Sequence, residues 1–170
     1  CDAGKKVIFV NFSGSPIAME PETKYCQAIL QAWYPGQSGG KAAAEVLFGD
    51  YNPAGRLPVT FYRNITQLPD FEDYNMTGRT YRYFKGDPLF PFGYGLSYTT
   101  FNYGNIKLEQ TIKVGETAKI IVPVTNTGNR DGEEVVQVYL KKQEDAEGPV
   151  KTLRAFKRVQ IPAGKTVNVE

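Results

Sequence analysis

Apolar positions in the first sixty residues change their spacing along the chain. Residues 6–12 form a nearly continuous apolar run between Gly4 and Gly14, which is typical of a strand buried on both faces. Residues 20–33 and residues 41–48 carry apolar side chains at the spacing of a helix. A strand followed by helices in this order predicts an α/β layer with a parallel sheet.

Glycine and proline punctuate the end of this region. Pro35 and Gly36 interrupt the chain before the second helix, and Gly49 offers the left-handed conformation that commonly ends a helix. Residues 52–55 have the composition of a turn, and residues 57–61 alternate as in a short strand.

Between residues 62 and 100 the chain is rich in Tyr, Phe, Gly and Pro and shows little periodicity. We interpret it as an ordered connector held by aromatic packing. Residues 81–84 are predicted to form a short strand, and residues 93–96 a tight turn that packs against the α/β layer.

Alternating segments return after residue 100. Turn signals at residues 126–129 and 162–164 separate them, which predicts a β-sandwich. A sandwich of about seven strands does not fit in the available length, so we expect an incomplete one. The four segments are 101–108, 117–124, 134–141 and 153–160.

Composition narrows the possible chemistry. The 170 residues include no histidine, which excludes a Ser-His-Asp triad, a Cys-His pair and an imidazole metal site. Cys1 and Cys26 are too few for a thiolate metal site, and Cys26 is predicted to be buried on a helix, with a disulfide to Cys1 as the alternative. The net charge of +2 gives no reason to expect a nucleic-acid or membrane partner, and no apolar run reaches the roughly 20 residues of a membrane span.

Two long motifs resemble a known family. They are WYPGQSGGKAAAEVLFGDYNPAGRLPVTF at residues 33–61 and PLFPFGYGLSYTTF at residues 88–101. Both resemble the C-terminal part of glycoside hydrolase family 3 enzymes, and the later segment VPVTNTGNRDGEEVVQVYL resembles their fibronectin type III-like domain. The resemblance implies an α/β plus all-β chain: residues 1–61 end an α/β sandwich domain, 62–100 connect, and 101–170 begin a fibronectin type III-like sandwich.

The resemblance also implies an activity for a larger protein. Family 3 enzymes are retaining exo-glycosidases with an Asp nucleophile on a preceding TIM barrel and, in many members, a Glu acid/base upstream of the segment seen here. We therefore expect no catalytic residue, metal or cofactor in this chain. The expected partner is an oligosaccharide or β-glycoside bound together with the missing barrel, and the expected location is periplasmic or extracellular. A second copy of the chain is a further possible partner, because an incomplete sandwich leaves a strand edge unpaired.

Phe71, Glu72, Asp73, Tyr74 and Arg79 in the connector have two interpretations. Either these residues fasten the connector to the domain surface, or they project into a sugar-binding cleft, where aromatic faces stack on pyranose rings and carboxylates accept hydroxyl hydrogen bonds. The second interpretation makes Glu72, Asp73, Tyr74 and Arg79 substrate-binding residues. Alternative functions for the whole chain are a non-catalytic carbohydrate-binding module, with Trp33, Tyr34 and residues 81–84 as its platform, and a purely structural sandwich.

Overall fold

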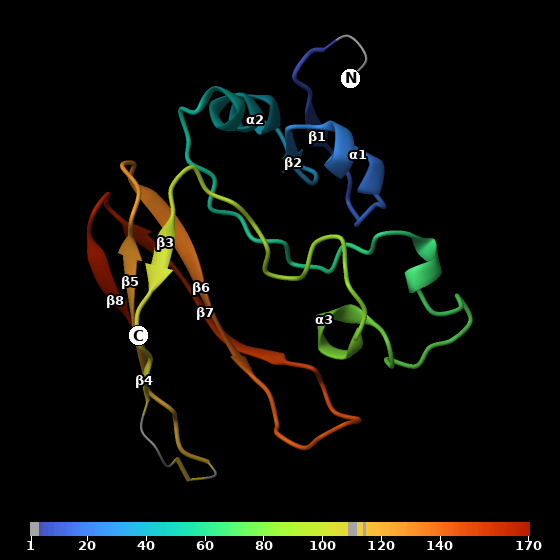
Figure 1. Ribbon diagram of the computed structural model, residues 1–170, viewed down its shortest axis with the longest axis vertical. Helices are drawn as coiled ribbons and strands as arrows, with labels where there is room; N and C mark the ends of the chain where they lie inside the picture. The colour runs from blue at the N-terminus through green and yellow to red at the C-terminus, as the bar shows by residue number, and fades with distance from the viewer. Residues whose placement is uncertain (1–3, 109–111, 114) are drawn as a thin grey trace. The chain divides into compact units, whose positions relative to one another are not determined.

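The computed structural model describes residues 4–108, 112–113 and 115–170, and these form two compact units (Figure 1). The first unit comprises Cys1–Asp50, Leu57–Tyr94 and Tyr139–Thr152. The second unit comprises Tyr51–Arg56, Gly95–Val138 and Leu153–Glu170. The units therefore interleave along the sequence, and the division at residues 61 and 100 stays a prediction about domain boundaries.

A parallel pair of strands opens the first unit. Strand β1 (Ile8–Asn11) pairs with β2 (Ala28–Gln31) in parallel, and helix α1 (Glu20–Tyr25) connects them (Figure 1). The predicted parallel α/β arrangement is confirmed. The expected burial of the first strand on both faces is wrong for this chain: Ile8 is half exposed, and Asn11 is the buried residue of β1.

The prediction of one helix over residues 20–33 is wrong beyond Tyr25. The backbone becomes extended at Cys26, and Ala28–Gln31 then pairs with β1. A short apolar run fits a buried helix and a buried strand equally well, so pairing with a neighbouring strand decides between them. Cys26 is consequently a free, partly buried thiol after the helix rather than a buried helical residue, and Cys1 lies outside the described residues.

Helix α2 (Gly39–Phe48) lies where the sequence predicts it. Its C-cap Gly49 has φ of 85°, the left-handed conformation that glycine adopts without a steric penalty. At the other end, a Cβ on Gly39 would come within 2.3 Å of the Pro35 Cγ atom. Gly49 therefore ends the helix through its conformational freedom. At the start of the helix, Gly39 is required because it packs closely against Pro35.

The segment after this helix forms less regular structure than predicted. Residues 57–61 contribute only an isolated bridge between Phe61 and Phe90 rather than a strand. The buried Phe61 ring meets Trp33 and Phe90 edge-on, with centroids 6.0 and 6.4 Å apart. Aromatic packing of this kind fixes the segment without a continuous strand pairing.

The connector contains a short 3-10 helix, η1 (Ile65–Gln67), and a helical turn, α3 (Thr80–Tyr83). The strand predicted for residues 81–84 is therefore wrong. The tight turn closes slightly earlier than expected, where the Tyr94 amide donates to the Pro91 carbonyl at 3.1 Å and Gly93 has φ of 81°. The Tyr94 ring stacks on Phe90 with centroids 5.4 Å apart.

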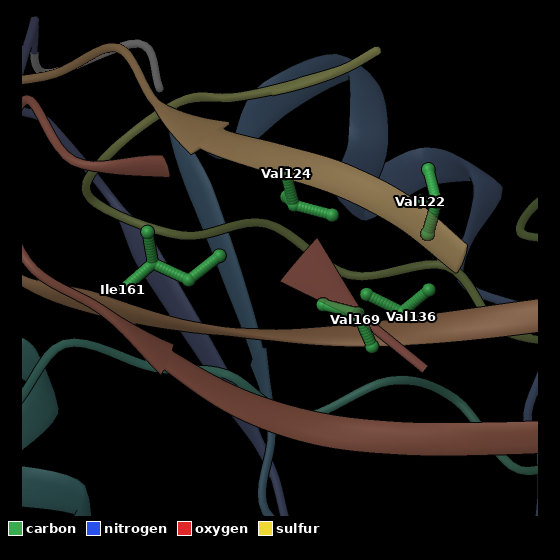
Figure 2. Close-up of a cluster of buried hydrophobic side chains, with 5 residues drawn as sticks. All are labelled: Val122, Val124, Val136, Ile161 and Val169. Atoms are coloured by element: carbon green, nitrogen blue, oxygen red, sulfur yellow. The ribbon is translucent and has the colours of Figure 1, made fainter. Parts of the chain in front are cut away.

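The second unit contains the β-sandwich elements. In one sheet, β5 (Ile120–Asn126) is the central strand, and β3 (Phe101–Tyr103), β4 (Lys107–Leu108) and β8 (Thr166–Val169) pair with it antiparallel. The other sheet pairs β6 (Gly132–Leu140) with β7 (Thr152–Ile161). Both sheets contribute to a common apolar core, shown in Figure 2: Val122, Val124, Val136, Ile161 and Val169.

Candidate substrate-contacting loop

The structure brings all four predicted site residues into one loop of the first unit, between η1 and α3 (Figure 1). Arg79 lies at its end and bonds back across it. The Arg79 Nη2 atom donates to the backbone carbonyls of Asp70, at 3.1 Å, and Asp73, while Nε donates to the Asn75 carbonyl at 3.0 Å. One guanidinium group therefore fastens three carbonyls of the same loop.

Asp73 stabilises the loop from within. Its Oδ1 atom accepts hydrogen bonds from the backbone amide of Asn75 at 2.9 Å and from Asn75 Nδ2 at 2.7 Å. These bonds hold the pKa of the Asp73 carboxyl below its usual range, mainly through the Asn75 amide and to a smaller extent through the charge of Arg79. The Asp73 carboxylate is therefore ionised at neutral pH and is already hydrogen-bonded within its own loop.

Glu72 and the two aromatic residues of the loop face solvent instead. The exposed fraction is 91% for Phe71 and 88% for Tyr74, and Glu72 is exposed as well. Large apolar rings are costly to expose and gain free energy when another surface covers them. The loop thus separates two roles that its sequence does not distinguish: Arg79 and Asp73 maintain its conformation, while Phe71, Glu72 and Tyr74 are available to a ligand.

The aromatic residues of the alternative carbohydrate-binding platform, Trp33, Tyr34 and residues 81–84, differ in their surroundings. Tyr81 stacks on Phe92 with centroids 4.2 Å apart and meets Tyr139 edge-on, so its ring is used in internal packing. Trp33 packs against Phe61 and adopts φ of 55°, which is unusual for a bulky side chain, whereas the Tyr34 ring beside it is exposed. These rings do not present a shared exposed face.

Two acidic residues elsewhere in the first unit form surface ion pairs. Lys24 with Glu20 and Lys41 with Glu45 are ion pairs within helices α1 and α2, at 3.3 and 3.6 Å. Among the residues that the structure describes, no group of three His, Cys, Asp or Glu side chains could hold a metal ion.

A buried ion pair in the second unit was not anticipated from the sequence. Arg56 Nη2 contacts both carboxylate oxygens of Glu134, at 2.9 and 2.8 Å, and little of either side chain is exposed. Burial raises the pKa of the nearby Tyr103 to about 12, and the negative charge of Glu134 adds to this effect. Because a buried charge needs a partner, this arrangement favours a structural role for Arg56 and Glu134.

The adjacent residue Glu133 joins a second, more exposed cluster. The Tyr51 hydroxyl donates to Glu133 Oε2 at 3.2 Å and accepts from Arg158 Nη2 at 2.7 Å, and Arg158 also pairs directly with Glu133. The bond from Arg158 lowers the pKa of Glu133. Residues 51–56 therefore bind two consecutive residues of β6, whose side chains leave a strand on opposite faces.

The described residues thus form an α/β layer followed by a β-sandwich, with a loop that carries aromatic and acidic side chains. Residues 1–98 match the glycosyl hydrolase family 3 C-terminal domain, and residues 134–170 match the fibronectin type III-like domain. The chain belongs to glycoside hydrolase family 3.

Named relatives agree with this assignment. The xylan 1,4-beta-xylosidase of Xylanibacter ruminicola is 61% identical over 164 residues, which cover 96% of this chain and 19% of that protein. The periplasmic beta-glucosidase of Salmonella typhimurium is 40% identical, covering 98% of this chain and 24% of that protein. The chain therefore spans about a fifth to a quarter of the length of these relatives.

Solved structures show the same fold. Beta-glucosidase 3B from Thermotoga neapolitana, solved in complex with glucose, superposes with a TM-score of 0.88 at 35% identity. The match covers 99% of this chain and 26% of that one. No helix in the described part of the chain has the length and apolar character needed to cross a membrane.

Proposed function

We propose that this chain is the C-terminal portion of a retaining, exo-acting β-glycosidase that hydrolyses β-xylosides or β-glucosides. The 61% identity to a named xylan 1,4-beta-xylosidase is the observation that carries this proposal, and it favours the xyloside. Catalysis by this family requires two carboxylates about 5 to 5.5 Å apart across the glycosidic bond. By the resemblance, both belong to the part of the protein upstream of this chain, so the chain serves as structure and as lining of the substrate cleft.

Within this function, we assign the loop at residues 70–79 to substrate contact. Glu72 and Tyr74 are the proposed contacts, because they combine a hydroxyl acceptor with an exposed aromatic face. Asp73 and Arg79 support them by fixing the loop backbone. We further propose a periplasmic or extracellular location, which is supported by the periplasmic beta-glucosidase among the relatives.

The test uses the full-length protein and a pair of aryl glycosides. We expect hydrolysis of p-nitrophenyl β-xyloside with retention of anomeric configuration, and a lower kcat/KM for the glucoside. Inversion, or no hydrolysis of either compound by folded full-length protein, would contradict the proposed activity. This chain alone is expected to hydrolyse neither compound, since it lacks the carboxylate pair.

A further inference from the structure

We propose that the 70–79 loop is a preformed platform for the outer sugars of a neutral oligosaccharide, with Phe71 and Tyr74 as its stacking faces. This inference rests on the proposed function and adds to it a substrate class and a chain-length preference. It also gives Arg79 a positioning role, distinct from the contact made by the rings.

The platform is preformed because the loop is bonded internally. Besides the three carbonyls that Arg79 fastens, the Asp73 amide donates to the Asp70 carbonyl and the Arg79 amide to the Met76 carbonyl, both at 3.1 Å. Gly78 has φ of 72°, the left-handed conformation with which the backbone turns at the end of the loop. A loop that is already ordered loses less conformational entropy when a ligand binds.

The chemistry of the exposed side chains fits a neutral sugar. A pyranose has an apolar C–H face that packs on an aromatic ring and hydroxyl groups that donate to a carboxylate. Phe71 and Tyr74 supply the rings, and the exposed Glu72, which lies between them in the sequence, supplies the acceptor. Nearby Asp70 and Asp73 make the loop locally acidic, which disfavours an anionic ligand.

The small size of the patch argues against a protein partner. Two rings and one carboxylate on a ten-residue loop are much less than the roughly 800 Å² that each partner buries in a stable protein interface. A sugar unit or two is a ligand of matching size. The occupant we infer is therefore an oligosaccharide rather than a second protein.

The exposure of the rings indicates which sugars bind. An exo-acting enzyme encloses the terminal sugar that it removes, and such a pocket buries most of its ligand. At 91% and 88% exposure, the Phe71 and Tyr74 side chains are suited to a sugar that keeps one face in water. We therefore expect the loop to contact mainly the sugars beyond the terminal one.

The experiment compares two substrates in the full-length enzyme: a p-nitrophenyl monoglycoside and the tetrasaccharide of the same sugar. We expect the double variant Phe71→Ala/Tyr74→Ala to raise KM for the tetrasaccharide tenfold or more, and by a clearly larger factor than it raises KM for the monoglycoside. The matched control is Phe156→Ala, an exposed ring on β7, which should alter neither value.

Arg79→Met tests the positioning role separately. Removing the guanidinium group releases three carbonyls, so we expect a raised tetrasaccharide KM together with faster proteolytic cleavage within residues 70–79. The Phe71→Ala/Tyr74→Ala variant should raise KM without this increase in cleavage. Equal cleavage of Arg79→Met and wild type would overturn the positioning role.

The outcomes separate this inference from the proposed function. If full-length enzyme hydrolyses the monoglycoside but the double variant treats both substrates as wild type does, or loses activity equally on both, the platform is wrong and the function stands. If the enzyme hydrolyses neither substrate, the function is wrong. Affinity electrophoresis in gels containing the tetrasaccharide then tests the platform separately. If the loop binds sugar, the gel retards the wild-type protein more than the double variant, and equal migration would contradict the platform.

Discussion

Arg56 and Glu134 form a buried ion pair although 77 intervening residues separate them in the sequence, with the guanidinium Nη2 atom 2.9 and 2.8 Å from the two carboxylate oxygens. The exposed fraction of the side chain is 11% for Arg56 and 9% for Glu134. Arg56 belongs to the NPAGRLP motif, which lies before the connector in the sequence, yet its partner is on β6. The motif therefore acts as part of the sandwich unit.

The first prediction concerns this ion pair. Arg56→Met and Glu134→Leu should each destabilise the second unit by about 3 to 5 kcal/mol, because each leaves a buried charge without its partner. The double variant Arg56→Met/Glu134→Leu should recover much of the loss, since it buries no charge. Urea unfolding measures all three variants, and additive effects in the double variant would mean that the pair is not coupled.

A second prediction follows from the pKa of Tyr103, which lies at about 12. A phenol with a folded-state pKa above its unfolded value of about 10 stabilises the fold fully below pH 10 and loses that contribution as the pH rises toward 12. Burial also raises the pKa of Tyr139, so absorbance at 295 nm should show a late ionisation to which both tyrosines contribute. The Tyr103→Phe variant should lose part of this late step, and an unchanged late step would contradict the raised pKa of Tyr103.

The third prediction concerns Asn126, which is fully buried at the end of β5. Its Oδ1 atom accepts from Thr99 Oγ1 at 2.6 Å, and its Nδ2 atom donates to the carbonyls of Arg130 and Ile161 at 2.8 and 2.9 Å. Asn126→Asp keeps the acceptor but loses both donors and places a charge beside two carbonyls. We expect a loss of about 3 kcal/mol or more in unfolding free energy.

Thr125→Asn is a suitable comparison for Asn126→Asp, because it lies next to Asn126 on the opposite face of β5. Thr125 makes an exposed hydroxyl contact with Thr166, so its replacement should cost about 1 kcal/mol or less. Similar losses for the two variants would show that the buried amide has no special role.

Sequence patterns predicted the structure best where a local physical rule decides it. The C-cap at Gly49 and the alternation in β5 and β6 depend on conformational freedom and on period-two burial, which are visible in the sequence. The strand at Ala28–Gln31 and the helical turn at Thr80–Tyr83 depend on partners distant in sequence, so their local apolar and aromatic runs were ambiguous.

The candidate loop shows the same limit. Its residues could be selected because aromatic and acidic side chains lie together in the sequence there, but the sequence does not show which of them bond within the loop. That division appears only when the Arg79 guanidinium is seen to fasten carbonyls of Asp70, Asp73 and Asn75. Arg56 was missed as a buried group because its partner on β6 gives no local signal.

The last prediction concerns the contact between the two sequence motifs that carry the family resemblance. A Cβ on Gly95, in PFGYGLSY, would come within 2.2 Å of the Gly55 carbonyl oxygen, in NPAGRLP, and within 3.1 Å of the Arg56 Cδ atom. Because the obstacle is backbone, it cannot move aside as a flexible side chain would. Gly95→Ala should therefore destabilise the second unit by about 1 to 3 kcal/mol.

Gly55→Ala is the matched control, since a Cβ at Gly55 has no atom within 4 Å. It adds a methyl group to the other glycine of this contact without creating a clash, so the stability of the variant should stay within about 0.5 kcal/mol of wild type. Thermal unfolding of both variants measures the difference. Equal melting temperatures would show that the motifs tolerate a side chain at Gly95, and that close backbone approach is not the reason for a glycine there.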